Sequence, residues 1–267
     1  MRIRIDGIDC EAEAGEFVKT VADRNGIAIP SLCHHSALPG LAACRLCVVE
    51  VTPAGGKTQT VTSCVYPVSE GLEVFTQSES ITRLRKTILR LLIDRAPKAE
   101  GRLQQYCEEY GVEASAVSAS PASASSPSAS QATNIPGPPD PEEQCILCGL
   151  CVKACDEMGV SAIAAVSRGV DKQIQSAFDE APEDCIGCLS CAKVCPTGKI
   201  VWTENNSRRS IWKKDFTLEK CSVCGKPFAT QEELAWLAER EVNENIDYSL
   251  CPKCRGRAAL AHTLLGQ

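Results

Sequence analysis

The sequence carries Cys145-Ile-Leu-Cys148-Gly-Leu-Cys151-Val-Lys-Ala-Cys155 and Cys185-Ile-Gly-Cys188-Leu-Ser-Cys191-Ala-Lys-Val-Cys195, two copies of one cysteine pattern. Both follow the spacing C-x2-C-x2-C-x3-C, and they begin 40 residues apart. Three cysteines at this spacing wrap a loop around an iron–sulfur cube, and the fourth ligates the other cube. The first cluster would therefore use Cys145, Cys148, Cys151 and Cys195, and the second Cys185, Cys188, Cys191 and Cys155.

A pair of structural zinc sites is the alternative for these eight cysteines. Zinc is held by two CxxC pairs and does not need a third cysteine at regular spacing, twice over. The pattern therefore predicts two [4Fe–4S] clusters in a bacterial-type ferredoxin domain over residues 142–204. Residues 163–166 and 173–176 are expected to pair as short strands, with residues 200–202 closing the sheet. Trp202 could pack against a cluster, although a place in an ordinary core is the simpler expectation.

Composition limits the class of protein. The chain has 267 residues, 18 of them cysteines, with only 4% aromatic residues, which favours several small domains over one large core. A secretory segment after Met1 and an apolar run of membrane-spanning length are both missing from the sequence, so we expect a cytoplasmic protein without membrane insertion. Its thiols are then metal ligands rather than disulfides. The net charge of −6 argues against nucleic acid and favours protein partners.

The first 78 residues predict a small β-grasp sheet that holds a [2Fe–2S] cluster. Residues 1–6 alternate as a strand, residues 8–14 can return as its hairpin partner, residues 16–25 read as a helix, and further strands are expected over 46–52, 58–64 and 72–76. The predicted cluster ligands are Cys33, Cys44, Cys47 and Cys64. A zinc site is the alternative. His34 and His35 could form a Rieske-like ligand set, but four cysteines already complete the site.

Three motifs in this region resemble a known family: Pro30-Ser-Leu-Cys33-His-His, Ala43-Cys44-Arg45-Leu46-Cys47-Val-Val-Glu50-Val51 and Thr62-Ser-Cys64. They are similar to the N-terminal [2Fe–2S] region of the large peripheral subunit of respiratory complex I, and to diaphorase subunits of NAD-linked hydrogenases and formate dehydrogenases. The resemblance extends over residues 1–204 and includes the first ferredoxin motif. It implies electron transfer between a flavin subunit that handles NAD(P)H and another redox centre.

A helical bridge over residues 79–111 and a linker over 112–141 are expected between these domains. Ser80 can cap a helix that runs to about Ala96, with an apolar face of Ile81, Leu84, Ile88, Leu91 and Leu92. The other face would carry Arg83, Arg85, Lys86, Arg90 and Arg95, either solvated or docked to an acidic partner. Relatives often hold a further cluster here through a histidine and three cysteines. This bridge has only Cys107, so we predict that the extra cluster is missing. The Ala/Ser/Pro-rich linker predicts a flexible tether.

The C-terminal part has two CxxC pairs, Cys221/Cys224 and Cys251/Cys254, which predict a four-cysteine zinc ribbon over residues 216–258. An iron–sulfur cluster and a rubredoxin-like iron remain alternatives. Residues 232–242 read as a helix with Leu234, Leu237 and Ala238 on one face. Arg208-Arg209 and Lys213-Lys214 are too few for a nucleic-acid surface, so we expect a docking or capping module. Cys10 and Cys107 are read as ordinary thiols.

Together these features predict an α+β chain of five parts: β-grasp domain, helical bridge, flexible linker, ferredoxin domain and zinc ribbon. The predicted cofactors are one [2Fe–2S] cluster, two [4Fe–4S] clusters and one zinc ion. With neither a nucleotide-binding motif nor a nucleophile–base pair in the sequence, we expect a non-catalytic electron-transfer subunit. Its partners would be flavin- and NAD(P)-binding subunits and a terminal redox enzyme, such as a hydrogenase or formate dehydrogenase. A free polyferredoxin shuttle is the main alternative, and a redox-sensing scaffold is a weaker one.

Overall fold

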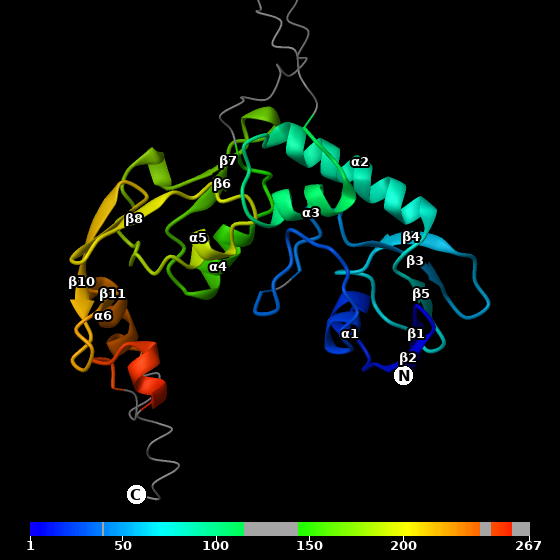
Figure 1. Cartoon of the computed structure of the whole chain (residues 1–267), viewed down its shortest axis with the longest axis horizontal. Helices are drawn as coiled ribbons and strands as arrows, with labels where there is room; N and C mark the ends of the chain where they lie inside the picture. Colours follow the sequence, from blue (N-terminus) through cyan, green and yellow to red (C-terminus); the bar gives the residue numbers. More distant parts are fainter. Residues whose placement is uncertain (39, 115–143, 241–246, 258–267) are drawn as a thin grey trace, which may run out of the picture. The chain divides into compact units, whose positions relative to one another are not determined.

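The computed structural model describes residues 1–38, 40–114, 144–240 and 247–257 (Figure 1). They form two compact units. The first contains residues 1–150, 167–173 and 196–199, and the second contains residues 151–166, 174–195 and 200–267. The segments expected to form the ferredoxin domain are therefore shared between the two units. The predicted linker lies outside the described residues from position 115 onward.

A five-stranded sheet and one short helix form the N-terminal part of the first unit. Their bounds are β1 Arg2–Ile5, β2 Ile8–Glu11, α1 Val18–Arg24, β3 Val48–Thr52, β4 Gln59–Thr62 and β5 Glu73–Phe75. The strand order is β2-β1-β5-β3-β4. Strands β1 and β5 are parallel, and the other neighbours are antiparallel. The predicted hairpin, helix and further strands of a β-grasp sheet are thus present.

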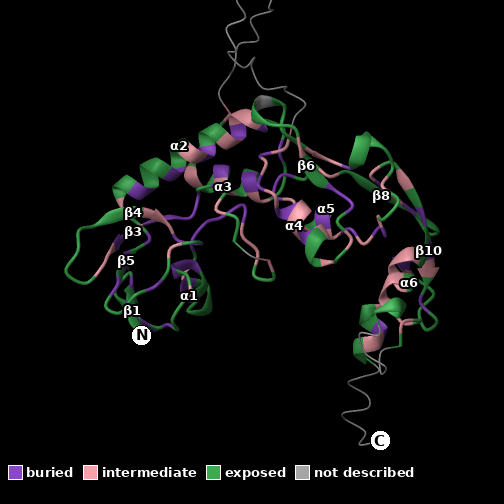
Figure 2. Ribbon diagram, turned by 180° about the vertical axis from the view of Figure 1, so that it is seen from behind, coloured by how far each residue is buried: buried purple, intermediate pink, exposed green. Residues whose placement is uncertain are grey.

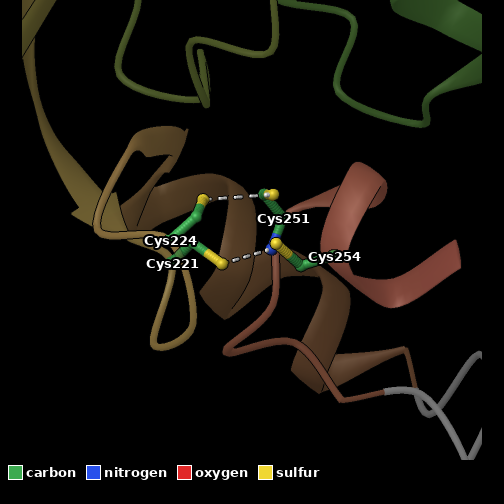
Figure 3. A group of neighbouring side chains, drawn as sticks. All are labelled: Cys221, Cys224, Cys251 and Cys254. Atoms are coloured by element: carbon green, nitrogen blue, oxygen red, sulfur yellow. Dashed lines mark hydrogen bonds between the residues drawn. The ribbon is translucent and has the colours of Figure 1, made fainter. Parts of the chain in front are cut away.

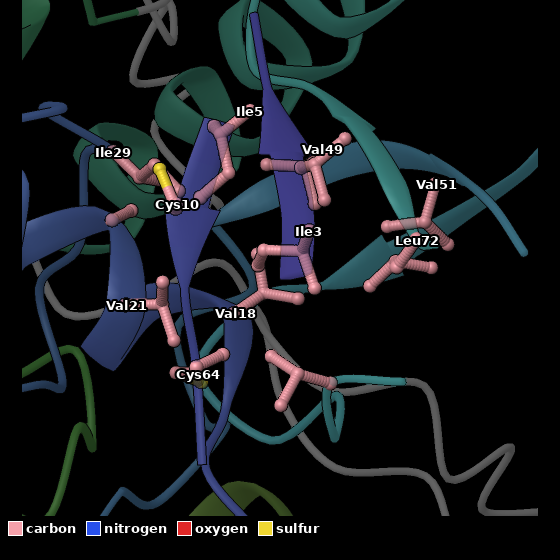
Figure 4. Packing of buried hydrophobic residues seen from close by; sticks show 14 of the residues in the cluster. Ile3, Ile5, Cys10, Val18, Val21, Ile29, Val49, Val51, Cys64 and Leu72 are labelled. Atoms are coloured by element: carbon pink, nitrogen blue, oxygen red, sulfur yellow. The ribbon is translucent and has the colours of Figure 1, made fainter. Parts of the chain in front are cut away.

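The alternation of the strands explains the core of this sheet. Ile3 and Ile5 of β1 point inward and are buried, whereas Arg2 and Arg4, which alternate with them, are exposed. They pack with Val18 and Val21 of α1 in one cluster (Figure 4), and each fully buried aliphatic side chain contributes about 1.5–3 kcal/mol. Two predicted cluster ligands, Cys47 and Cys64, belong to the same cluster. The sheet core therefore holds part of the candidate site directly.

Two helices complete the first unit up to residue 114: α2 Glu79–Arg95 and α3 Arg102–Tyr110. The predicted N-cap Ser80 is wrong by two residues, because the Ser78 hydroxyl accepts the Ile81 N–H at 3.1 Å. The predicted apolar face is also rotated. Its buried positions are Ile81, Arg85, Leu89 and Ile93, as the alternation of buried and exposed positions along α2 in Figure 2 illustrates. Leu84 and Leu91 are exposed.

The predicted basic face of α2 is partly structural. Arg85 is only 3% exposed, since its guanidinium donates to the Val48 carbonyl at 2.7 Å and to the Tyr110 hydroxyl at 3.2 Å. Arg95 donates from Nε to the Cys145 carbonyl at 2.8 Å. A buried charge is tolerated only with such partners. Arg85 therefore ties α2 to β3 and α3, and it is not part of a solvated surface.

The second half of the chain contains α4 Leu150–Glu157, β6 Ala164–Val166, η1 Gly169–Asp171, β7 Gln173–Gln175, η2 Ala177–Asp179, α5 Ser190–Val194, β8 Trp202–Glu204, β9 Arg208–Ile211, β10 Lys214–Lys220, β11 Pro227–Thr230 and α6 Gln231–Glu239. Strands β6 and β7 form a two-stranded sheet, as the sequence predicts, and a four-stranded sheet has the order β11-β10-β9-β8. Among the described helices, none has the length and apolarity needed to cross a membrane.

Residues 200–202 do not close the β6–β7 sheet. Instead, β8 pairs antiparallel with β9, with Trp202 opposite Ile211, because the C-terminal hairpin offers β8 a free edge. Trp202 is 42% exposed, so the expectation of a core role is wrong as well. The predicted C-terminal helix is confirmed over most of its length as α6, which ends at Glu239, and residues 241–242 of the prediction lie outside the described residues. Thr230 caps α6 by accepting the Glu233 N–H at 3.0 Å. Leu234 and Leu237 are half-buried, but Ala238 is exposed.

Candidate metal centres

The four cysteines predicted to hold a [2Fe–2S] cluster come from one long loop of the first unit, between α1 and β3, and from the segment just after β4. Cys33 lies in the loop after α1, Cys44 and Cys47 lie just before β3, and Cys64 follows β4. All four are at most 5% exposed. The loop approaches Cys64 closely at Gly40, where an added Cβ would lie 3.0 Å from the Cys64 carbonyl oxygen.

Their sulfurs interact in two pairs. The Cys44 thiol hydrogen bonds to Cys33 and lowers the pKa of Cys33, and the Cys64 thiol lowers the pKa of Cys47 in the same way. Backbone N–H groups also point at sulfur, from Leu32 to Cys44 and from Cys44 to Cys33, both at 3.3 Å. Such donors stabilise thiolates. Two pairs of neighbouring cysteine sulfurs fit a two-iron cluster, in which each iron takes two protein ligands.

A buried cation and two histidines surround this site. The Lys19 ammonium is 5% exposed and donates to Asp23 at 2.9 Å and to the Ile29 carbonyl at 3.0 Å. Lys19 also contributes to the lowered pKa of Cys47, although hydrogen bonding from Cys64 is the main cause. His34 Nε2 lies 3.5 Å from Asp23, and His35 Nδ1 accepts the Ala37 N–H at 3.2 Å. These partners favour the four-cysteine site over a Rieske-like one.

The second [4Fe–4S] set converges within the second unit. Cys155 lies on α4, Cys185 and Cys188 on the loop between η2 and α5, and Cys191 on α5. All four line a single pocket together with Ile211 and Trp212. Apolar walls of this kind keep water away from a cluster. The sequence pattern identifies the four cysteines, but it gives no indication that residues beyond 204 would complete the pocket.

Each of these four sulfurs has a hydrogen-bond partner. The Ala162 N–H donates to Cys155 Sγ at 3.2 Å, and the Cys188 thiol donates to the Ser190 hydroxyl at 3.3 Å. Burial raises the pKa of Cys185, and the Gly187 N–H opposes this rise. Burial likewise raises the pKa of Cys191 to about 11, against the opposing hydrogen bond from Trp212 Nε1 at 3.4 Å. The donors to Cys155, Cys185 and Cys191 suit thiolates that bind a metal cluster.

The first [4Fe–4S] set is distributed over both units. Cys145 and Cys148 belong to the first unit, and Cys151 and Cys195 to the second. Locally, the Leu147 N–H donates to Cys145 Sγ at 3.4 Å, with Leu147 at a φ of 53°. A positive φ turns a backbone N–H toward a ligand sulfur at the cost of strain. Assignment of these four cysteines to one cluster stays a prediction.

The C-terminal cysteines form the tightest group. The sulfurs of Cys221, Cys224, Cys251 and Cys254 all lie within 4.8 Å of one another, and within the described residues no other group of three or more metal-binding side chains is so close (Figure 3). Cys224 and Cys251 have their sulfurs 3.8 Å apart. Zn–S bonds of about 2.3 Å at tetrahedral angles require sulfur separations of about 3.8 Å. The geometry therefore fits a single ion.

Backbone contacts hold this group in place. The first pair forms a turn in which the Cys221 N–H donates to Lys226 and the Gly225 N–H donates to the Cys221 carbonyl, both at 2.9 Å. Gly225 has a φ of 68°, which glycine adopts without strain. Across the site, the Cys251 N–H donates to Cys221 Sγ at 3.3 Å and is the main cause of the low pKa of Cys221, about 6. This thiol is thus prepared for metal binding.

Two family models match the chain. Residues 1–79 match a 2Fe-2S iron-sulfur cluster binding domain, and residues 141–202 match a 4Fe-4S dicluster domain. The matches include the first three predicted cysteine sets and end before the C-terminal four-cysteine group. A 2Fe-2S domain and a 4Fe-4S dicluster domain are therefore present, as the cysteine spacing predicts.

Curated relatives are subunits of oxidoreductases. The chain is 31% identical over 231 residues to the NADPH-Fe(3+) oxidoreductase subunit alpha of Geobacter sulfurreducens, covering 83% of this chain and 26% of that protein. It is 29% identical to the G 2 subunit of the NADH-quinone oxidoreductase of Rhizobium meliloti, with coverages of 84% and 27%. It is 30% identical to the HndD subunit of the NADP-reducing hydrogenase of Solidesulfovibrio fructosivorans, with coverages of 75% and 36%. The chain thus spans about a quarter to a third of these relatives.

A solved structure agrees with these sequences. The crystal structure of an NAD+-reducing [NiFe]-hydrogenase in the H2-reduced state contains a chain that superposes with a TM-score of 0.55 at 28% identity, covering 74% of this chain and 85% of that one. The predicted resemblance to complex I-like and hydrogenase iron–sulfur subunits is therefore confirmed.

Proposed function

We propose that this chain, which carries a 2Fe-2S domain and a 4Fe-4S dicluster domain and resembles subunits of NAD(P)-linked oxidoreductases, is the electron-relay subunit of such a multi-subunit complex. It would connect a flavin-containing NAD(P)H module to another redox enzyme, such as a hydrogenase, formate dehydrogenase or similar reductase. We place it in hetero-oligomers as a non-catalytic subunit. Its cytoplasmic location stays a prediction.

We assign the cofactor ligands to three sets of cysteines. They are Cys33, Cys44, Cys47 and Cys64 for one [2Fe–2S] cluster, Cys145, Cys148, Cys151 and Cys195 for one [4Fe–4S] cluster, and Cys155, Cys185, Cys188 and Cys191 for the other. These clusters, when bound, take up and release single electrons. The observation that carries the assignment is the pocket of the second unit, where four cysteines meet and each sulfur has a partner.

The protein contributes ligands, hydrogen bonds and exclusion of water. At the [2Fe–2S] set, the buried Lys19 ammonium supplies positive charge beside the cysteines. At the second [4Fe–4S] set, burial disfavours the more negative state of the sulfurs, and hydrogen-bond donors favour it. The balance between these two effects sets the reduction potential of the cluster relative to the others. We propose residues 1–78, 79–111, 112–141, 142–204 and 216–258 as the β-grasp, bridge, linker, ferredoxin and ribbon parts.

We assign a zinc ion to Cys221, Cys224, Cys251 and Cys254. The sulfurs are close enough for one tetrahedral ion, whereas an iron–sulfur cluster would place several metal atoms between them. A rubredoxin-like iron would need the same sulfur geometry, so metal analysis must decide between these ions. Helix α6 buries none of its residues. A bound ion would therefore stabilise the part of this module around α6, while Phe216, Leu218 and Ala229 form the small apolar core of its strands.

The test is anaerobic purification of the tagged full-length chain from its native host. We expect a complex much larger than the 28.6 kDa chain that contains a flavin subunit, with about ten irons and one zinc per copy of this chain. Addition of NADH or NADPH should reduce its clusters, as seen by electron paramagnetic resonance. A fully loaded chain that migrates alone, near 28.6 kDa, and binds no flavin subunit would refute the complex and favour a free polyferredoxin shuttle.

A further inference from the structure

The C-terminal sheet contributes to the pocket of the second [4Fe–4S] set although it lies beyond the matched dicluster domain, which ends at residue 202. The partners of Cys155, Cys185 and Cys188 in this pocket come from the ferredoxin segment itself; they are Ala162, Ile163, Gly187 and Ser190. The partner of Cys191 is Trp212, in the turn between β9 and β10. The hydrogen bond to Cys191 is thus supplied from outside the ferredoxin sequence.

The turn that presents Trp212 is strained. Trp212 and Lys213 connect β9 to β10 with φ values of 54° and 61°. Two-residue hairpin turns with both φ values positive favour Asn-Gly, and bulky residues adopt them at a cost of about 1–3 kcal/mol each. Here the surroundings hold the turn in place. Lys213 Nζ contacts both the carbonyl and the carboxylate of Asp179, each at 2.7 Å, while the Trp212 indole reaches Cys191.

The next residue brings a positive charge to the same loop. Lys214 Nζ donates to the carbonyls of Glu183 and Cys185 at 2.6 and 2.8 Å, and its side chain is half-buried over the Phe216 ring. Its charge is one of the influences that lower the pKa of Cys185. Neither of its two hydrogen bonds involves a carboxylate, so the ammonium charge is not neutralised by an ion pair in the described contacts.

Further bonds fix the sheet against the cluster-binding loop. Arg209 is 6% exposed and donates to the Gly187 carbonyl at 2.7 Å. The buried Thr230 hydroxyl donates to the Ile186 carbonyl at 2.5 Å. The three successive carbonyls of Cys185, Ile186 and Gly187 therefore all accept bonds from the C-terminal sheet. Three hydrogen bonds to consecutive carbonyls show that the sheet packs specifically against this loop.

We propose that the β9–β10 hairpin tunes the cluster held by Cys155, Cys185, Cys188 and Cys191, with Trp212 and Lys214 raising its reduction potential. The inference rests on the proposed cluster assignment. Reduction adds one electron, from the external donor, to the bound cluster and makes its sulfurs more negative. An N–H donor and a nearby cation stabilise that reduced state more than the oxidised one. Trp212 and Lys214 act through Cys191 and the loop at Cys185, and neither residue would itself ligate the cluster.

The test is a redox titration of the full-length protein with dithionite, followed by electron paramagnetic resonance, for wild type, Trp212→Phe and Lys214→Gln. Loss of one hydrogen bond of about 0.5–1.5 kcal/mol changes an equilibrium roughly two- to tenfold, and a tenfold change in a one-electron equilibrium is about 59 mV. We expect one [4Fe–4S] potential to fall by up to this amount in Trp212→Phe, with the other two clusters unchanged. Lys214→Gln should lower the same potential.

Two matched controls lie on the same sheet. Trp202→Phe changes the half-exposed tryptophan of β8, and Lys220→Gln changes the exposed lysine at the other end of β10. Neither should move a potential. Iron content is measured in parallel, so that loss of the cluster is separated from a shift in its potential. If Trp212→Phe cannot hold the cluster, wild-type protein with 15N-labelled indole nitrogen provides a second measurement by electron–nuclear double resonance, which needs no substitution.

A coupling of the Trp212 nitrogen to one cluster, or the predicted fall in one potential, supports the inference. Fully loaded Trp212→Phe with three unchanged potentials would overturn it and leave the proposed relay intact. Absence of the nitrogen coupling in loaded wild-type protein would overturn it as well. Wild-type protein with no iron bound to Cys155, Cys185, Cys188 and Cys191 would instead overturn the proposed function, and the inference with it.

Discussion

Replacement of Gly187 by alanine should destabilise the second unit more than a strained φ alone can explain. Gly187 has a φ of 69°, and its added Cβ would lie 2.9 Å from two carbon atoms of the Phe216 ring. The positive φ costs about 1–2 kcal/mol for a residue with a Cβ. Phe216 is 1% exposed and cannot move aside, so overpacking adds about 1–3 kcal/mol. We expect a total loss of about 2–5 kcal/mol.

Gly225→Ala is the matched control, because Gly225 has a φ of 68° and no atom within 4 Å of its added Cβ. Only the first cost applies there, about 1–2 kcal/mol. The assay is equilibrium urea unfolding of anaerobic, metal-loaded protein followed by tryptophan fluorescence. All three tryptophans, Trp202, Trp212 and Trp236, belong to the second unit, so the signal reports that unit. Agreement of the two variants within about 0.5 kcal/mol would refute packing of Phe216 against this loop.

Three further outcomes are expected. Cys224→Ser should lose the single zinc ion while the iron content is retained, as checked by elemental analysis; loss of iron in proportion would show that this site holds iron. Lys19→Met removes a buried cation beside Cys47, so it should lower the [2Fe–2S] potential without moving the [4Fe–4S] potentials in a redox titration. Zinc affinity, measured by chelator competition, should fall more steeply with decreasing pH once the pH is below about 6. The Cys251 N–H lowers the pKa of Cys221 to about 6, so this ligand is a thiolate above that pH and must lose a proton to bind zinc below it. A constant slope of affinity against pH through that value would contradict this.

Local patterns predicted most of the elements. The alternation of residues 2–5 and the turn at Gly7 correctly indicate the hairpin, and regular cysteine spacing identifies the sulfurs that meet in the second unit. The sequence does not single out Ser78 as the N-cap of α2, because Ser78 and Ser80 both lie within one turn of the helix start and both fit the N-cap preference. Such choices depend on backbone geometry that composition does not reveal.

Other errors came from contacts between distant residues. Arg85 looks like a surface residue in any hydrophobicity pattern, yet in the interior its two terminal nitrogens donate to the Val48 carbonyl and the Tyr110 hydroxyl. Trp212 could not be linked to Cys191, because the link depends on a hairpin turn at Trp212 and Lys213, where neither glycine nor asparagine signals a positive φ. Contacts between residues so far apart in the sequence become visible only in the tertiary structure.

The attachment of the C-terminal sheet to the loop at Cys185, Ile186 and Gly187 matters for anyone who wishes to produce a minimal dicluster fragment. A chain cut at residue 202, where the match to the dicluster domain stops, would keep all eight cysteines but leave three carbonyls without their donors. It would also open one side of the cofactor chamber to solvent and oxygen. The segment that matches the dicluster domain and the fragment that keeps these hydrogen bonds therefore end at different residues.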